Sequence, residues 1–207
     1  MKLSKINKKF IYLISPNKIK NSSFYLELIK IFKLKKVSFF QLRLKNESKK
    51  KKIIIAKKIQ KICKIYKVKF LINDDPILAK KLNADGCHLG QKDMNIVKAR
   101  KFLKKKIIGI TCHNSIKLAK IAIKNNADYI AFGAFFASKT KKTKYVAKIN
   151  ILNSIKKISK IPIVAIGGIS SNNYKKLLLN KANFLAISGY IWNNKKYKPA
   201  EAIKKIR

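Results

Sequence analysis

A chain of 207 residues, 47% of them hydrophobic, is long enough to form one α/β domain and too apolar to be disordered, in spite of a formal net charge of +43. Its apolar runs fall well below the ~18 residues that a membrane-spanning helix needs, so we expect no membrane partner. Three cysteines without a C-x-x-C spacing indicate reduced thiols in the cytoplasm and no structural zinc.

The excess positive charge is almost entirely lysine. The chain has 51 basic and 8 acidic residues, and its only arginines are Arg43, Arg100 and Arg207. Proteins that read nucleic acid cluster their charge on one face and favour arginine, whereas these lysines are spread through every segment. We therefore expect no specific nucleic-acid partner, and only salt-dependent attraction of anionic substrates and polyanions.

Eight apolar runs alternate with segments of helical periodicity. The first follows a lysine-rich start, but it is too short for a signal peptide and no small-residue cleavage site follows it. We predict these runs to be strands, spanning residues 10–14, 37–44, 68–73, 86–89, 107–111, 129–135, 163–166 and 184–187.

Alternating strands and helices are typical of a parallel sheet. Eight such units in about 200 residues predict a (β/α)8 TIM barrel, with residues 1–207 as a single domain and a short third crossover. An open doubly wound sheet is the structural alternative. Because ligands bind at the carboxyl ends of parallel strands, polar residues that follow the predicted strands are candidates for function.

The second predicted strand ends in polar residues. Period-two alternation places Gln41, Arg43 and Lys45 on one face and Leu42 and Leu44 on the other. Three polar groups in a barrel mouth favour an anionic ligand, and an arginine in a lysine-rich chain favours a bidentate contact to phosphate. The alternative is an exposed edge face.

Half of the eight acidic residues lie between positions 74 and 93. Asp74 and Asp93 follow the third and fourth strands, and together with Asn73 they supply the oxygen ligands that Mg²⁺ prefers. Each acid also has an alternative role as a helix cap. Asp75 precedes Pro76, which suits the first turn of a helix, and Asp93 precedes a predicted helix at residues 94–103.

Two histidines and a threonine lie on or after the fourth and fifth strands. We interpret His88 as a core histidine with satisfied hydrogen bonds. His113 has either a functional or a packing role, and Thr111 either binds a ligand or caps the next helix.

The segments after the sixth, seventh and eighth strands have the composition of phosphate sites. Residues 133–142 interleave small hydroxyls with lysines, although a solvated lysine run has the same appearance. Gly167 and Gly168 follow the seventh strand, and Ser188 and Gly189 follow the eighth. Loops at these two places commonly bind phosphate in barrels of this kind.

Six segments, taken in order, carry a family resemblance that covers nearly the whole chain. They read Q-L-R-x-K, I-N-D-D, A-D-G-C-H-L-G-Q-K-D, G-I-T-C-H, D-Y-I-A-F-G-A-F-F-A-S-K-T-K and V-A-I-G-G-I. Together they resemble the thiamine-phosphate synthase family. The resemblance implies a Mg²⁺-dependent transferase that couples hydroxymethylpyrimidine diphosphate to a thiazole phosphate, plain or carboxylated, and releases pyrophosphate.

The resemblance also implies roles for individual residues. The pyrimidine diphosphate would be held by Gln41, Arg43, Lys45, Asn73, Thr111 and Lys141, with Lys141, Arg43 and Thr111 closest to the chemistry, and Mg²⁺ by Asp74 and Asp93. The thiazole phosphate would be held by Ser138, Lys139, Thr140, Gly168, Ser188 and Gly189.

The chain departs from the family pattern at the thiazole end, at Ala134, Ala137 and Ser138, and the register of Ser188 and Gly189 can shift by one residue. The related thiazole tautomerases share the barrel but bind no diphosphate, so the residues assigned to the diphosphate favour the synthase. A polyanion-binding protein on an inactive barrel is the remaining alternative. The sequence leaves a homo-oligomer open.

Overall fold

Eight parallel strands close into a barrel in the computed structural model, which describes residues 9–19, 21–137 and 145–206. Each strand pairs with the next, and β8 pairs with β1. The (β/α)8 barrel is confirmed, and the open-sheet alternative is wrong. The strands are β1 (Ile11–Ile14), β2 (Val37–Leu42), β3 (Lys69–Asn73), β4 (Gly86–Leu89), β5 (Ile107–His113), β6 (Tyr129–Phe132), β7 (Ile163–Ile166) and β8 (Phe184–Ile187).

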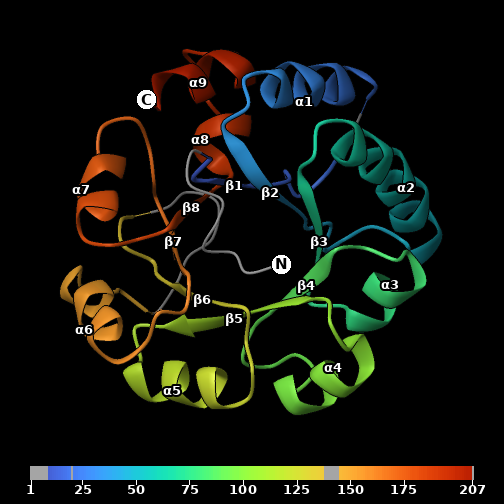
Figure 1. The fold of residues 1–207 in the computed structure, drawn as a ribbon. Helices are drawn as coiled ribbons and strands as arrows, with labels where there is room; N and C mark the ends of the chain where they lie inside the picture. Colours follow the sequence, from blue (N-terminus) through green and yellow to red (C-terminus); the bar gives the residue numbers. More distant parts are fainter. Residues whose placement is uncertain (1–8, 20, 138–144, 207) are drawn as a thin grey trace.

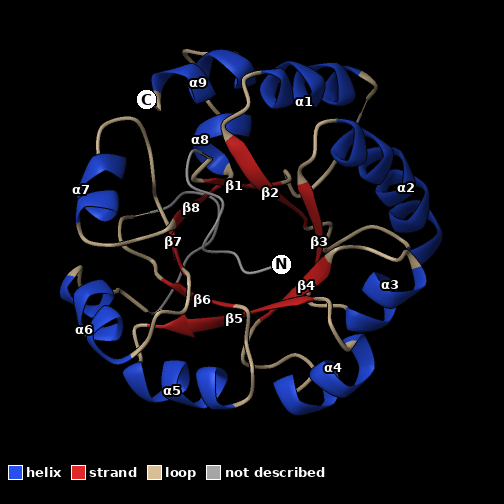
Figure 2. Cartoon of the chain, in the orientation of Figure 1, coloured by secondary structure: helices blue, strands red, loops and turns tan. Residues whose placement is uncertain are grey.

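Helices form a ring outside the strands (Figure 1, Figure 2). The crossover after β3 is short, as predicted, because α3 has only six residues. The helices are α1 (Ser23–Lys33), α2 (Lys49–Ile65), α3 (Pro76–Lys81), α4 (Ile96–Leu103), α5 (Ile116–Lys124), α6 (Asn150–Ile158), α7 (Tyr174–Leu179), α8 (Gly189–Trp192) and α9 (Pro199–Lys205).

Two strands end earlier than the sequence predicted. The last pair that joins β2 to β3 is Leu42 with Ile72, so Arg43 already lies in the loop. In β6 the last pair is Phe132 with Ala165, and the amide of Ala134 does not donate to a neighbouring strand. The amide of Ala134 donates instead to the carbonyl of Tyr145 at 3.1 Å.

Alternate residues of each strand face the inside and the outside of the barrel. The outward residues pack with the helices into the larger apolar core. The inward residues form a smaller cluster that fills the barrel, as in other barrels of this fold. That cluster consists of Tyr12, Ile14, Phe39, Leu71, Tyr129, Ala131, Val164, Phe184 and Ala186.

Polar side chains fasten the amino ends of neighbouring strands. For β4, β6 and β8, the side chain of the residue that directly precedes the strand accepts a hydrogen bond from a backbone amide at or near the start of the strand before it. These contacts are Asp85 to Phe70 N at 2.9 Å, Asp128 to Ile108 N at 2.8 Å and Asn183 to Ile163 N at 2.9 Å. Asp85 therefore serves the framework, far from the strand ends that carry the candidate site.

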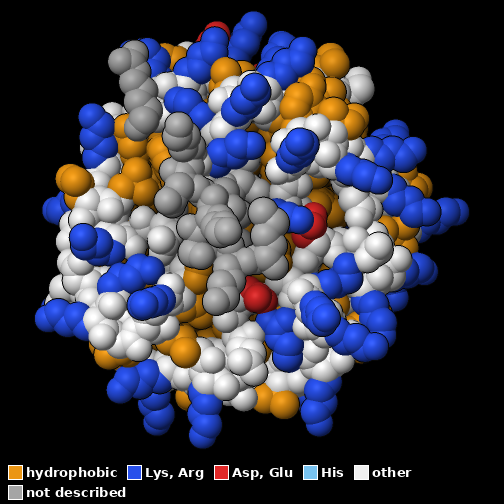
Figure 3. All heavy atoms as spheres, in the orientation of Figure 1, with side chains coloured by type: hydrophobic (Ala, Val, Ile, Leu, Met, Phe, Trp, Pro, Cys, Tyr) orange, Lys and Arg blue, Asp and Glu red, His pale blue; other side chains and the backbone are white. Residues whose placement is uncertain are grey.

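Lysines and arginines are spread over the described part of the face shown in Figure 3, and acidic side chains are few there. This distribution agrees with a diffuse coat rather than a basic patch. Within the described residues, no helix is long and apolar enough to cross a membrane.

Candidate functional site

The polar residues Gln41, Arg43 and Lys45 lie at the end of β2 and directly after it. Gln41 is 2% exposed, and its Nε2 donates to the hydroxyl of Tyr12 at 3.0 Å inside the barrel. Arg43 is half-buried, and its guanidinium donates to Oδ1 of Asn17 at 2.8 Å. Lys45 is exposed. The exposure of the three polar side chains therefore increases from Gln41 in the barrel interior to Lys45 in the solvent. The alternative of an exposed edge face is wrong for Gln41.

Asp74 and Asp93 bring two carboxyl groups together beyond the ends of β3 and β4. Asp74 has a left-handed backbone with φ of 63°, and its amide donates to the carbonyl of His88 at 2.8 Å. The pKa of Asp74 is raised to about 6, first by burial and then by a hydrogen bond with Asp93 and by the charge of Asp93. Lys45 and Arg43 act in the opposite direction.

The two cap alternatives have different outcomes. Oδ1 of Asp75 accepts the amide of Leu78 at 2.8 Å, so Asp75 caps α3 in front of Pro76, as predicted. Asp93 does not cap α4, which begins two residues later than predicted and is capped by Asn95. Oδ2 of Asp93 instead accepts the amide of Gly90 at 2.6 Å. A tight turn therefore aims Asp93 at Asp74.

His88 is a satisfied core histidine, as predicted. Its Nδ1 lies 2.8 Å from the hydroxyl of Tyr129, and its Nε2 lies 2.8 Å from Oγ1 of Thr111. Burial lowers the pKa of His88 to about 4, so the ring is neutral near pH 7. The cap alternative for Thr111 is wrong because Ser115 caps α5.

His113 stacks on the ring of Tyr145, with 4.0 Å between the ring centroids. Its backbone has a left-handed φ of 52°, beside an irregularity in the pairing of β5 with β6. This geometry supports the packing role of His113.

The residues that follow β7 and β8 form the second part of the site. Gly168 has a left-handed φ of 63°, and a Cβ there would lie 2.3 Å from the carbonyl oxygen of Ala137. Ser188 Oγ donates to the carbonyl of Ser15 at 3.2 Å, and α8 begins at Gly189. The indole of Trp192 donates to the carbonyl of Ile14 at 2.7 Å and holds α8 against β1.

Four predicted residues, Ser138, Lys139, Thr140 and Lys141, lie outside the described residues. Their roles stay predictions. Ala137 and Tyr145, which flank that segment in the sequence, are near Gly168 and His113 respectively.

The sequence reasoning missed Tyr12 and Asn17, which contact Gln41 and Arg43, and it missed Tyr129, which contacts Tyr12. A signal for the tyrosines was present, because period-two alternation places both rings inside the barrel. A tyrosine hydroxyl in such an interior requires a hydrogen-bond partner. Asn17 had no comparable signal, because it lies in an irregular loop.

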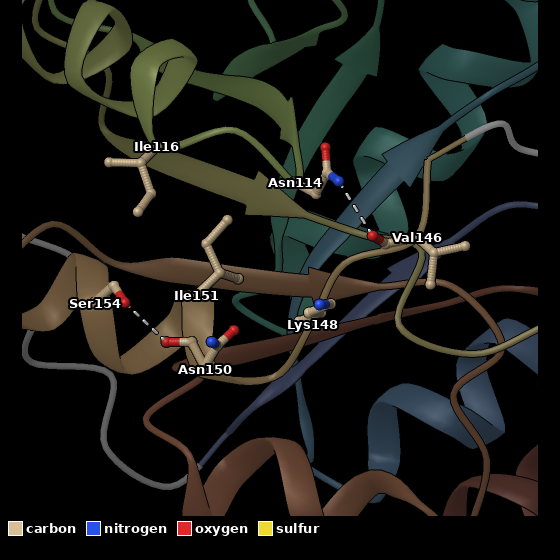
Figure 4. Close-up of a pocket in the computed structure, with 7 residues that line it drawn as sticks. All are labelled: Asn114, Ile116, Val146, Lys148, Asn150, Ile151 and Ser154. Atoms are coloured by element: carbon tan, nitrogen blue, oxygen red, sulfur yellow. Dashed lines mark hydrogen bonds between the residues drawn. The ribbon is translucent and has the colours of Figure 1, made fainter.

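A hollow of about 240 Å³ lies apart from this site, between the segment after β5 and α6 (Figure 4). Asn114 Nδ2 donates there to the carbonyl of Val146 at 3.2 Å. Lys148 is the only ionisable side chain among its lining residues. The hollow therefore does not have the paired carboxylates and cations that distinguish the strand ends.

The fold and the site together place the protein among the (β/α)8-barrel enzymes, whose active sites lie at the carboxyl ends of the strands. The carboxyl pair of Asp74 and Asp93, the half-buried Arg43 and the turn with Gly167 and Gly168 lie at that end.

Comparison with known proteins narrows the class. The sequence model of the family described as thiamine monophosphate synthase matches residues 11–191, so the chain belongs to that family. It is 71% identical to thiamine-phosphate synthase of Pelagibacter ubique over 207 residues, which is 100% of both chains. It is 41% identical to thiamine-phosphate synthase of Saccharophagus degradans over 73% of this chain and 70% of the relative.

A solved structure agrees with the sequence relatives. Thiamine phosphate pyrophosphorylase from Pyrococcus furiosus superposes with a TM-score of 0.85 at 26% identity, covering 98% of this chain and 95% of that one.

Proposed function

We propose that the chain is a thiamine-phosphate synthase. This transferase joins 4-amino-5-hydroxymethyl-2-methylpyrimidine diphosphate to a thiazole phosphate, plain or carboxylated, and releases pyrophosphate. Membership of the family and full-length identity of 71% to a synthase support the reaction. The observation in the structure that carries the proposal is the carboxyl pair of Asp74 and Asp93 with Arg43 and Lys45 close enough to act on its charge.

The carboxyl pair fits a divalent cation. Burial is the largest cause of the raised pKa of Asp74, followed by its hydrogen bond with Asp93 and by the repulsion between the two carboxylates when both are ionised. Within the described residues, no group of three or more His, Cys, Asp or Glu side chains is arranged to hold a metal ion. Mg²⁺ commonly uses only one or two carboxylates and completes its shell with substrate phosphates. We therefore assign Mg²⁺ to Asp74 and Asp93, where it would neutralise phosphate charge.

The cationic side chains near the pair bind the diphosphate. Arg43 presents a planar fork that matches phosphate oxygens, and its contact with Asn17 fixes the direction of that fork. Lys45 and Lys141 add charge where pyrophosphate leaves. Preorganised charge of this kind contributes several kcal/mol to a transition state, about 3 for a single well-placed group.

The pyrimidine lies over the barrel mouth in this proposal. Gln41 and Asn73 hold its polar atoms from β2 and β3, and Thr111 does so from β5. Departure of pyrophosphate leaves a pyrimidine methylene cation, which the thiazole nitrogen captures.

The thiazole phosphate binds at the other side of the mouth. In this proposal the backbone amides of Gly168, Ser188 and Gly189 donate to the phosphate, whereas the amides of Ile191 and Trp192 donate to the carbonyl of Ser188. Ser138, Lys139 and Thr140 complete this part of the site. We also propose, from the cysteine pattern, that the enzyme works in the cytoplasm on these small molecules.

One assay tests the proposal against the tautomerase alternative. Purified protein is incubated with both substrates and Mg²⁺, and thiamine phosphate and pyrophosphate are measured directly. A synthase forms both products in equal amounts. A tautomerase forms neither, and its product would be an isomer of the thiazole phosphate alone.

A further inference from the structure

A chain of hydrogen bonds crosses the inside of the barrel and joins two residues assigned to the pyrimidine. Gln41 contacts the Tyr12 hydroxyl at 3.0 Å, which lies 2.7 Å from the Tyr129 hydroxyl. The Tyr129 hydroxyl lies 2.8 Å from His88 Nδ1, and His88 Nε2 lies 2.8 Å from Thr111 Oγ1. The proposed function uses only the two ends of this chain.

The two tyrosines in the middle of the chain are buried. Tyr12 and Tyr129 are each 1% exposed and belong to the apolar cluster that fills the barrel. A buried hydroxyl proton without an acceptor is costly, so the protons must be arranged to satisfy every member.

The contact of Gln41 sets the order of these protons. Gln41 Nε2 donates to the oxygen of Tyr12, so the proton of Tyr12 needs an acceptor and finds it in Tyr129. The proton of Tyr129 then goes to His88 Nδ1. A neutral imidazole has one donor and one acceptor nitrogen, so His88 carries its proton on Nε2 and donates it to Thr111. With the Gln41 amide in this orientation, the reverse order leaves the proton of Tyr12 with no acceptor among these groups.

The backbone of β5 makes room for this arrangement. A Cβ at Gly109 would lie 1.8 Å from Cζ of Tyr129 and 2.3 Å from its hydroxyl oxygen. The ring of Tyr129 therefore occupies the space that any other residue at position 109 would fill. Glycine at this position places the hydroxyl between Tyr12 and His88.

We propose that Tyr12, Tyr129 and His88 are positioning residues that fix the direction of a hydrogen-bond chain, so that Thr111 always accepts from His88 and offers its own proton to the ligand. The site is then specific for a ligand that presents an acceptor to Thr111, such as a pyrimidine ring nitrogen, rather than an amino group. The ligand part of this inference rests on the proposed function, whereas the direction of the chain does not.

The tautomer of His88 tests the direction without any substrate. The protein has two histidines, and His113→Asn leaves only His88; asparagine tolerates the left-handed backbone of position 113. Two-bond ¹H–¹⁵N correlation spectra then show which ring nitrogen carries the proton. We expect Nε2–H. A spectrum of the Nδ1–H tautomer would overturn the proposal.

Two matched variants test the middle of the chain, since Tyr12→Phe and Tyr129→Phe each remove one hydroxyl from the same buried cluster. Tyr12→Phe should keep the Nε2–H tautomer, because Tyr129 still donates to His88. Tyr129→Phe should give a mixture of tautomers, because Nδ1 loses its donor. Thermal unfolding confirms that both variants fold. Identical spectra for the two variants would contradict the proposed order. If either variant fails to fold, the tautomer of His88 in the His113→Asn protein, which keeps both tyrosines, still decides the direction.

Steady-state kinetics test the link to the ligand. Tyr129→Phe should raise KM for the pyrimidine diphosphate by about tenfold, the effect of one misplaced hydrogen bond, with KM for the thiazole phosphate unchanged. Thr111→Val, which removes the hydroxyl itself, should reproduce this pattern. Equal increases in both KM values would show general damage and would refute positioning. A protein that makes no thiamine phosphate but shows the Nε2–H tautomer would refute the proposed function alone.

Discussion

Arg100 Nη2 lies 2.5 Å from Asp128 Oδ2, and this ion pair joins α4 to the amino end of β6. The same guanidinium donates to the backbone carbonyls of Lys104, Lys106 and Asn126. One of the three arginines of the chain therefore binds backbone and a carboxylate instead of a ligand. An arginine in a lysine-rich chain indicates a position that needs several hydrogen-bond donors with fixed directions. Such a position can stabilise the fold, as Arg100 does, or bind phosphate.

We expect Arg100→Lys to destabilise the fold by about 1–3 kcal/mol, because an ammonium group cannot reproduce the directions of these donors. Synthase activity of the folded protein should not change. Urea unfolding measures the loss, and the exposed neighbour Lys98→Arg is the control. Unfolding midpoints equal to that of the unmodified protein would show that the network does not contribute.

The fold was predictable because its signal is local. Runs 86–89, 163–166 and 184–187 were predicted with the bounds that the structure has. The ends of β2 and β6 were not, because they depend on where the neighbouring strand stops pairing. The sequence of a single strand does not indicate how long the neighbouring strand is.

The site was predictable in part for a similar reason. Asp74 follows a strand, and strand ends meet at one end of a barrel, so its place near Asp93 follows from topology. The framework role of Asp85 depends on the amide of Phe70, fifteen residues earlier in the chain. The contact of Tyr12 with Tyr129 joins residues 117 positions apart. No local pattern records such pairs.

The metal assignment predicts that substitutions of Asp93 and Asp75 differ in their effect on the Mg²⁺ requirement. If Asp74 and Asp93 hold Mg²⁺, chelation should abolish turnover, and Asp93→Asn should need at least about tenfold more Mg²⁺ for half-maximal activity, since loss of one ligand charge weakens a hard-cation site. Asp75→Asn is the control, because Asp75 caps α3 and asparagine caps helices equally well.

Titration of activity with Mg²⁺ measures both variants. Full activity in excess chelator would rule out the metal assignment. An equal increase in the Mg²⁺ concentration for half-maximal activity in the two variants would show that Asp93 is not a specific metal ligand.

The buried histidine predicts a pH dependence of stability. The pKa of His88 is about 4 in the folded chain and about 6.5 in an unfolded one. The unfolded chain therefore takes up the proton first, so the contribution of His88 to stability is full above pH 6.5 and is lost as the pH falls toward 4.

Comparison with His88→Gln isolates this contribution from other titrating groups such as Asp74. We expect the difference in free energy of unfolding between the two proteins to shrink as the pH falls from 6.5 to 4. A difference that is constant over this range would contradict a buried neutral imidazole.

The lysine coat predicts weak binding of RNA. A diffuse distribution of charge gives an affinity that falls steeply with salt and does not depend on sequence. Fluorescence anisotropy with two unrelated RNA oligonucleotides should show equal binding at low salt and none near physiological salt. Tight binding of one oligonucleotide at that salt would favour the polyanion-binding alternative.

The assignment of Lys141 separates a synthase from a tautomerase, because only a synthase has a departing pyrophosphate to contact. Lys139, Lys142 and Lys144 are close to Lys141 in the sequence, so a general field effect would be shared among all four. A contact to the leaving group strengthens as the bond to carbon breaks. Lys141→Ala should therefore lower kcat and kcat/KM together, by on the order of 10²-fold.

Lys142→Ala is the matched control and should be nearly silent. Binding of the thiazole phosphate should survive in both variants, because that part of the site is assigned to Gly168 and the residues after β8. Steady-state kinetics with both substrates, together with direct binding of the thiazole phosphate, measure these effects. Equal and small losses in the two variants would mean that the lysines act only as a shared positive charge and that Lys141 has no contact of its own with pyrophosphate.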